Sequence, residues 1–142
     1  MNKHILCAVD LTHDEDARAI LAEAGRLAKF DGAALSLVCV LPDYGSSWVG
    51  SFFKEGTMQA AAEAALQTLR AMVESVLPDF GHVQCIVEIG SVYEKIIETA
   101  SECGSDLVVV GAHKPDLKDR IIGPNAARVA RHAPVSVLVL RL

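Results

Sequence analysis

Positive charge is scarce in this chain. It carries 13 Lys and Arg against 18 Asp and Glu, a formal net charge of −5. Proteins that hold nucleic acids depend mainly on surplus Lys and Arg, so this balance argues against a general nucleic-acid binder, and any anion must be bound locally. No apolar run approaches the roughly 20 residues that a membrane helix needs, and no signal-peptide core follows the first residues. We therefore expect a cytoplasmic protein with no membrane insertion.

Familiar catalytic signatures are also absent. The sequence has no Ser-His-Asp arrangement, no metal-spaced His or Cys cluster and no GxxxxGK[ST] loop, so nucleophilic and zinc chemistry have no support. A response-regulator receiver would need a phosphoacceptor Asp after its third strand, where this chain has Ile89-Gly90-Ser91. The cysteines show no CxxC spacing, and we expect buried free thiols rather than disulfides: Cys7, Cys39, Cys85 and Cys103.

What is present describes one well-cored domain spanning residues 1–142. The chain is 51% hydrophobic and 22% charged, and it contains no repeat, low-complexity segment or linker. Aliphatic runs with almost no alternation are typical of strands buried on both faces, and stripes of helical period lie between them. The expected strands are 5–9, 34–41, 83–89, 106–110 and 135–140, and the expected helices are 14–30, 57–77, 91–100 and 125–132.

This order predicts a five-stranded parallel, doubly wound α/β sheet with helices on both faces and strand order 3-2-1-4-5. Polar residues interleave the strand 83–89, which favours an edge position for it. Ser91 followed by Glu94 predicts a capping box at the start of the third helix.

The stretch from Leu107 to Ala126 is the first candidate site. A continuous apolar run ends on Gly111, a polar loop follows, and Gly123 with Pro124 opens a helix. Backbone amides at a helix start are unpaired and the helix dipole favours negative charge there, so a phosphate is the hypothesis.

Asp10 is the second candidate, because ligands of open α/β sheets gather at the carboxyl ends of strands. Its carboxylate could accept hydrogen bonds from a ribose or adenine or hold a metal. It could equally cap the helix that follows.

At these positions the sequence resembles the universal stress protein family, in particular its small single-domain bacterial members. The resemblance rests on a strand ending in Val9-Asp10, a strand ending in Cys-Val-Leu-Pro, and a closing pattern that runs from Asp-Leu-Val-Val-Val-Gly through Gly-Pro-Asn-Ala-Ala-Arg to the last strand. It implies an adenine-nucleotide α-hydrolase-like fold. One branch of the family binds ATP through Gly-x-x-Gly followed later by Gly-Ser or Gly-Thr, where glycines let backbone amides approach the phosphates.

Carried over to this chain, Gly111 matches the first glycine and Gly123 the third. Lys114 stands in place of the second glycine, and Pro124 replaces the Ser or Thr. The loop therefore resembles a His-Lys-Pro variant of the ATP-binding branch. Lys114 can pair with a phosphate, whereas Pro124 has no N–H or hydroxyl and suits the first position of a helix.

The resemblance implies an adenine-nucleotide site in which the base rests on apolar residues, Asp10 holds the nucleoside and the loop holds phosphates. His113 either touches phosphate or is a solvated loop histidine. The implied ligand is ATP, or AMP or ADP, with Mg²⁺ supplied by solvent, and hydrolysis is slow or absent. The implied site residues are Ala8, Val9, Asp10, Val40, Gly111, His113, Lys114, Gly123, Asn125 and Ala126.

Two functional readings stay open. In the first, the protein is a nucleotide-dependent stress-response or regulatory switch. In the second, favoured by Lys114 and Pro124, it is a dimeric module of the non-nucleotide branch that acts through protein partners. Either way, the apolar strand from Val135 to Leu140 would be a hazardous exposed edge, and the resemblance implies that it pairs antiparallel with its copy in a homodimer.

Overall fold

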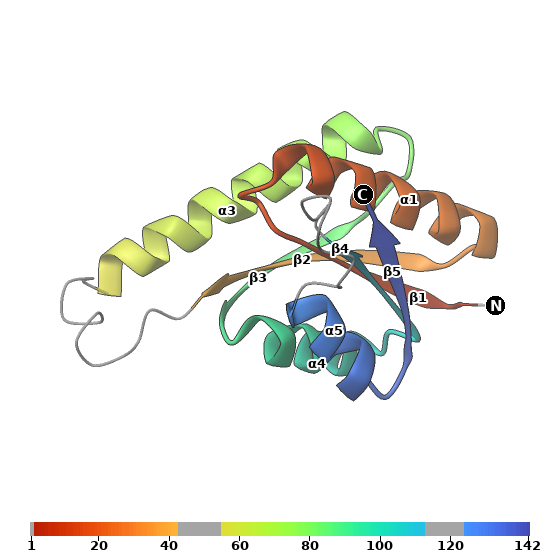
Figure 1. Cartoon of the computed structure of the whole chain (residues 1–142). Helices are drawn as coiled ribbons and strands as arrows, with labels where there is room; N and C mark the ends of the chain where they lie inside the picture. The colour runs from red at the N-terminus through yellow and green to blue at the C-terminus, as the bar shows by residue number, and fades with distance from the viewer. Residues whose placement is uncertain (1, 43–54, 113–123) are drawn as a thin grey trace.

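Five strands alternate with four helices along the part of the chain that the structure describes. The structure is a computed structural model, and it describes residues 2–42, 55–112 and 124–142. The elements in chain order (Figure 1) are β1 (His4–Val9), α1 (Asp14–Asp31), β2 (Ala34–Pro42), α3 (Glu55–Val76), β3 (Gln84–Gly90), α4 (Val92–Cys103), β4 (Leu107–Ala112), α5 (Pro124–His132) and β5 (Ser136–Arg141).

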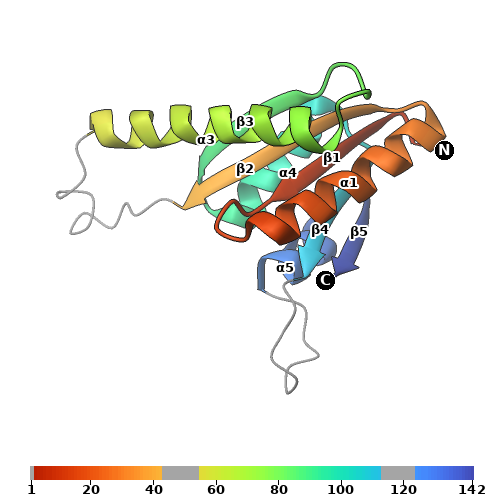
Figure 2. The ribbon, with the colours of Figure 1, turned by 90° about the horizontal axis from the view of Figure 1, so that it is seen from above.

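The strands form one parallel sheet in the order β3-β2-β1-β4-β5, which confirms the predicted topology. Helices α1 and α3 lie over one face, and α4 and α5 lie over the other (Figures 1 and 2). The strand with interleaved polar residues, β3, is at an edge as expected. None of the described helices is long and apolar enough to cross a membrane.

The central strand β1 supplies side chains to both layers of the core. Ile5, Cys7 and Val9 pack with α1 and α3, while Leu6 and Ala8 pack with α4 and α5. All five are buried. A strand covered on both faces has no solvent side, which explains why its sequence shows no alternation of polar and apolar residues.

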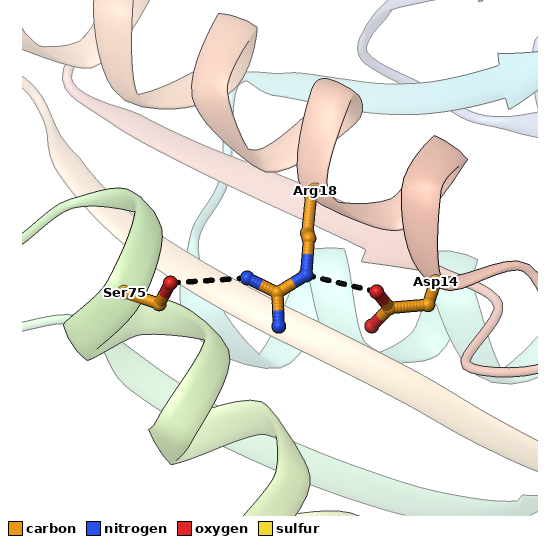
Figure 3. Close-up of polar contacts among 3 residues, drawn as sticks. All are labelled: Asp14, Arg18 and Ser75. Atoms are coloured by element: carbon orange, nitrogen blue, oxygen red, sulfur yellow. Dashed lines mark hydrogen bonds and ion pairs between the residues drawn. The ribbon is translucent and has the colours of Figure 1, made fainter.

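A close contact holds α1 against α3. A Cβ atom at Gly25 would lie 2.5 Å from Cδ2 of Leu77, so glycine at this position lets the end of the α3 segment approach α1. Arg18 of α1 donates through Nε to the Asp14 carboxylate at 2.9 Å and through a terminal nitrogen to the Ser75 hydroxyl at 3.1 Å (Figure 3). These contacts join the two helices into one layer on this face of the sheet.

Strand β4 is longer than predicted. It continues to Ala112, and Gly111 lies within it, in register with Leu140 of β5. The expectation that the strand ends by residue 110 was wrong because the ladder with β5 carries the pairing further. Gly111 is therefore a strand residue.

The predicted capping box at α4 does not form. Ser91 is the N-cap, with an extended backbone, but its side chain makes no capping hydrogen bond. The Glu94 carboxylate instead accepts a hydrogen bond from the Tyr93 hydroxyl at 3.2 Å. The neighbouring tyrosine thus competes with the local motif.

All four cysteines are free, as predicted, but only Cys7 and Cys39 are buried; Cys85 and Cys103 are half-buried. Burial raises the pKa of the Cys7, Cys39 and Cys85 thiols. These side chains are protonated near neutral pH and act as small apolar residues.

Asp106 joins the start of β1 to the start of β4. Its Oδ2 accepts the Lys3 amide at 2.8 Å, and its Oδ1 accepts the His4 amide at 3.2 Å. These bonds, the Lys3 amide first, lower the pKa of the Asp106 carboxyl. The charged carboxylate therefore ties together two strands that are distant in sequence.

We predict that Asp106→Asn destabilises the protein at neutral pH and that the deficit shrinks in acid. A carboxyl whose pKa is lower in the folded state stabilises the fold above its unfolded pKa of about 3.9, and this contribution is lost as pH falls through the folded value. Chemical denaturation of both proteins from about pH 7 to about pH 3 measures the gap. Asp79→Asn is the control, since Asp79 is exposed and has no side-chain hydrogen bond within the described chain. A gap that is constant with pH would contradict the prediction.

Candidate functional site

The site begins with a difference in strand length. Pairing of β1 with β2 ends at Val9 and Cys39, whereas β2 continues beside β3 as far as Pro42. On the other side, β4 continues beside β5 to Ala112 after its last pair with β1 at Val109. Because neighbouring strands lie about 4.8 Å apart, a slot of roughly 10 Å between strand axes opens past the end of β1. The slot lies at the carboxyl end of the sheet, where the winding reverses.

A cavity of about 560 Å³ occupies this slot, a size typical of small-molecule sites. It reaches both layers of the core. Its lining includes apolar residues from the side of α1 and others from the side of α4 and α5: Val9, Ala17, Ile20, Cys39, Leu41 and Leu142 on the first side, and Ala8, Val38, Val40, Val92, Ile96, Val110 and Ala126 on the second.

The two rims of the cavity differ in charge. One rim carries Asp10, Thr12, His13 and Asp16, and the first turn of α1 holds three acidic residues. The other rim carries Asn125 at the start of α5, whose first turn has no acidic residue. Unpaired amides at a helix start favour an anion, so the anionic part of a ligand is more stable beside α5 than beside α1.

Asp10 is the first residue after β1, and it stabilises the turn that leads to α1. Its Oδ1 accepts the Thr12 amide at 2.9 Å and the Thr12 hydroxyl at 2.7 Å. The N-cap of α1 is His13, so Asp10 does not cap the helix. Its carboxylate is exposed at the cavity rim, and Oδ2 has no hydrogen-bond partner within the described chain.

Cys39 contributes an inert thiol to the cavity wall. It is 3% exposed, and burial raises its pKa. The Leu11 amide donates a hydrogen bond to this sulfur, which acts in the opposite direction on the pKa. A protonated, buried thiol is a poor nucleophile, so Cys39 gives the cavity wall no reactive group.

The structure brings seven of the predicted site residues to this one cavity: Ala8, Val9, Asp10, Val40, Gly111, Asn125 and Ala126. His113, Lys114 and Gly123 lie outside the described residues. Within the described chain, no group of three His, Cys, Asp or Glu side chains is arranged to hold a metal ion, so the structure gives no support to a metal held by Asp10.

Sequence reasoning missed the helix residues that wall the cavity. Ala17 and Ile20 come from the first turns of α1, and Val92 and Ile96 come from the start of α4. A signal was available, since each pair belongs to the first inward-facing positions of a helix that begins at the carboxyl edge of the sheet. Thr12 and Leu142 were also missed.

Packing accounts for the glycine at position 111. A Cβ atom there would lie 2.3 Å from Cδ1 of Ile20 and 3.3 Å from Cδ1 of Leu142. Both neighbours line the cavity. The absence of a side chain at Gly111 thus lets Ile20 close one wall of the slot.

Comparison with known proteins decides the family. A sequence profile described as the universal stress protein family matches residues 1–141. The chain belongs to this family. Universal stress protein G of Shigella flexneri is 35% identical over 146 residues, which cover 99% of this chain and 100% of that relative.

Solved structures with universal stress protein folds superpose on nearly the whole chain. UspA from Lactobacillus plantarum has a TM-score of 0.78 at 26% identity, covering 98% of this chain and 97% of that one. A family member in complex with cAMP has a TM-score of 0.69 at 17% identity, covering 98% and 97%. The universal stress protein of Archaeoglobus fulgidus in complex with dAMP has a TM-score of 0.64 at 23% identity, covering 96% and 96%. The last two comparisons show the shared fold.

We predict that Gly111→Ala costs about 1–3 kcal/mol, because the new methyl group overpacks against Ile20. Ile20→Val removes the δ-methyl group that the alanine would meet and alone costs about 0.5–1.5 kcal/mol. The double variant should therefore be less destabilised than the sum of the single variants. Chemical denaturation of the four proteins measures the coupling. Additive costs would show that Ile20 is not the obstacle at this position.

Proposed function

We propose that this universal stress protein binds an adenine nucleotide in the cavity past the end of β1 and acts as a nucleotide-dependent regulatory module. The observation that carries the proposal is the cavity itself. Apolar walls from two helix layers enclose a slot with a hydrogen-bond acceptor on one rim and a helix start on the other. A flat base, a polar sugar and an anionic tail match these three parts in order.

The base is best placed in the slot between β2 and β4. There Ala8, Val9 and Val40 form the floor and sides, and the α1 and α4 residues cover the two faces of the ring. Backbone groups of β2 beyond Cys39 no longer have β1 as a neighbour, so they are available to the ring edge. Such groups select orientation as well as affinity.

The phosphates are best placed toward α5. The acidic first turn of α1 repels them, whereas the amides of Asn125 and Ala126 lie at the positive end of a helix. Gly111 lines the cavity, and between it and α5 the sequence contains His113, Lys114 and Gly123. Any Mg²⁺ would be bound by the phosphates of the nucleotide and would enter the site with them.

The family comparison supports a nucleotide of the AMP class. Two fold neighbours are in complex with cAMP and with dAMP. For this chain we propose ATP, ADP or AMP, with slow hydrolysis at most. Mass spectrometry of small molecules released from the purified protein, followed by calorimetry with each nucleotide and Mg²⁺, tests the proposal. An apo protein with flat titrations would favour the alternative, a module that acts through protein partners.

We predict that Asp10→Ala weakens nucleotide binding. Loss of a hydrogen bond to a charged group costs about 1.5–3 kcal/mol, or roughly ten- to a hundredfold in affinity. Asp14→Ala is the matched control, because it changes the charge of the same region equally while Asp14 faces Arg18 and not the cavity. Calorimetry should show a large loss for the first variant and little change for the second. Equal changes in affinity for the two variants would show that Asp10 makes no specific contact with the nucleotide.

We also propose that the protein is a homodimer through β5, with the two copies antiparallel. β5 is an edge of the sheet, and its four apolar residues Val137 to Leu140 are each half-buried. An uncovered edge of this composition invites pairing with another strand. Antiparallel pairing about a two-fold axis completes its hydrogen bonds and covers its apolar side chains.

We predict that Leu138→Lys gives a folded monomer, because lysine at an edge strand opposes pairing. Ile89→Lys is the control on the opposite edge, since Ile89 lies on β3 and is 38% exposed. Light scattering at micromolar concentration, with circular dichroism to verify folding, should return a dimer for the control. A wild-type monomer would overturn the dimer proposal and leave nucleotide binding untouched.

A further inference from the structure

The turn between β1 and α1 contains a polar side chain that the proposed site does not yet use. We infer that Thr12 is a positioning residue, which holds the Asp10 carboxylate in the orientation that the nucleotide requires. The inference rests on the proposed function and extends it to a residue that does not itself need to touch the ligand.

The contacts divide the Asp10 carboxylate into two parts. Oδ1 accepts both the amide and the hydroxyl of Thr12, at 2.9 and 2.7 Å. Bonds to a charged acceptor are stronger than neutral ones. Oδ2 has no partner within the described chain, so its lone pairs are available for a sugar hydroxyl or an amino group. Thr12 thereby separates a structural oxygen from a ligand-binding oxygen.

The backbone of the turn is fixed by other bonds. The His13 amide donates to the Asp10 carbonyl at 3.1 Å. The Ala17 amide continues into α1 by donating to the His13 carbonyl at 2.9 Å. The Thr12 hydroxyl is therefore not needed to close the turn. What it adds is the orientation of one side chain.

Orientation matters at Asp10 because the residue is exposed on the cavity rim. An exposed aspartate samples several staggered rotamers, and a ligand that needs one of them must bear the entropy of ordering it. Immobilising one side chain in advance corresponds to about two- to tenfold in affinity. Thr12 is placed to supply that order before the ligand arrives.

The test is a double-mutant cycle measured by calorimetry with AMP and with Mg-ATP. We predict that Thr12→Val, which is isosteric but lacks the hydroxyl, weakens binding about two- to tenfold. Thr12→Ser keeps the hydroxyl and should bind like the wild type. In an Asp10→Ala background, Thr12→Val should have no further effect, because its action passes through Asp10. A merely structural role would persist in that background.

A readout without nucleotide completes the test. Three-bond NMR couplings about the Asp10 Cα–Cβ bond should report one rotamer in the wild type and averaging in Thr12→Val. Averaging in the wild type, equal affinity of the wild type and Thr12→Val, or an undiminished loss in the Asp10→Ala background would each overturn the inference while nucleotide binding stands. A wild type that binds no nucleotide would instead overturn the proposed function, and this inference with it.

Discussion

The early end of the central strand is the constraint on which the site depends. β1 is hydrogen-bonded on both sides and buried on both faces. Along its length it therefore fills the space between β2 and β4. Once it stops at Val9, its neighbours continue and the space between them has no strand to fill it. The cavity is therefore a property of register rather than of any one side chain. The same ending explains why Asp10, the next residue, stands at the cavity rim.

The two ends of this slot differ in charge, because the first turns of α1 and α5 differ in their acidic residues. α1 begins with Asp14, Glu15 and Asp16, which neutralise the positive end of its dipole. α5 begins with Pro124 and Asn125 and has no acid in its first turn. This charge pattern would orient the proposed nucleotide, with its phosphates toward α5, before any specific contact forms. This also explains how a protein of net charge −5 can offer a local place for an anion.

The fold and part of the site could be predicted from sequence because both follow from strand ends. The carboxyl ends of neighbouring parallel strands lie at the same edge of the sheet, so the sequence predicts that Val9-Asp10 and Val40 are neighbours in space. Ile20 and Ile96 could not be predicted in the same way. Helical period places them on an inward face, but how far each helix extends over the end of β1 depends on packing, such as the approach of α1 to α3 at Gly25. The reason for the glycine at position 111 could not be predicted either. The sequence suggests that Gly111 makes room for a ligand, whereas the distance to Ile20 shows that it makes room for that side chain.

The cavity is bounded by both helix layers of the molecule, which lie on opposite faces of the sheet. Ala17 and Ile20 belong to the layer tied together by Arg18 and Ser75, and Val92 and Ile96 belong to the layer of α4 and α5. A molecule bound between them would contact both helix layers at once, at the carboxyl end of the sheet. Its binding free energy would add to the resistance of both layers against local opening. Occupancy of the cavity would then reduce local opening of both helix layers, including surfaces far from the ligand. A partner protein that binds such a surface could distinguish the occupied from the empty state.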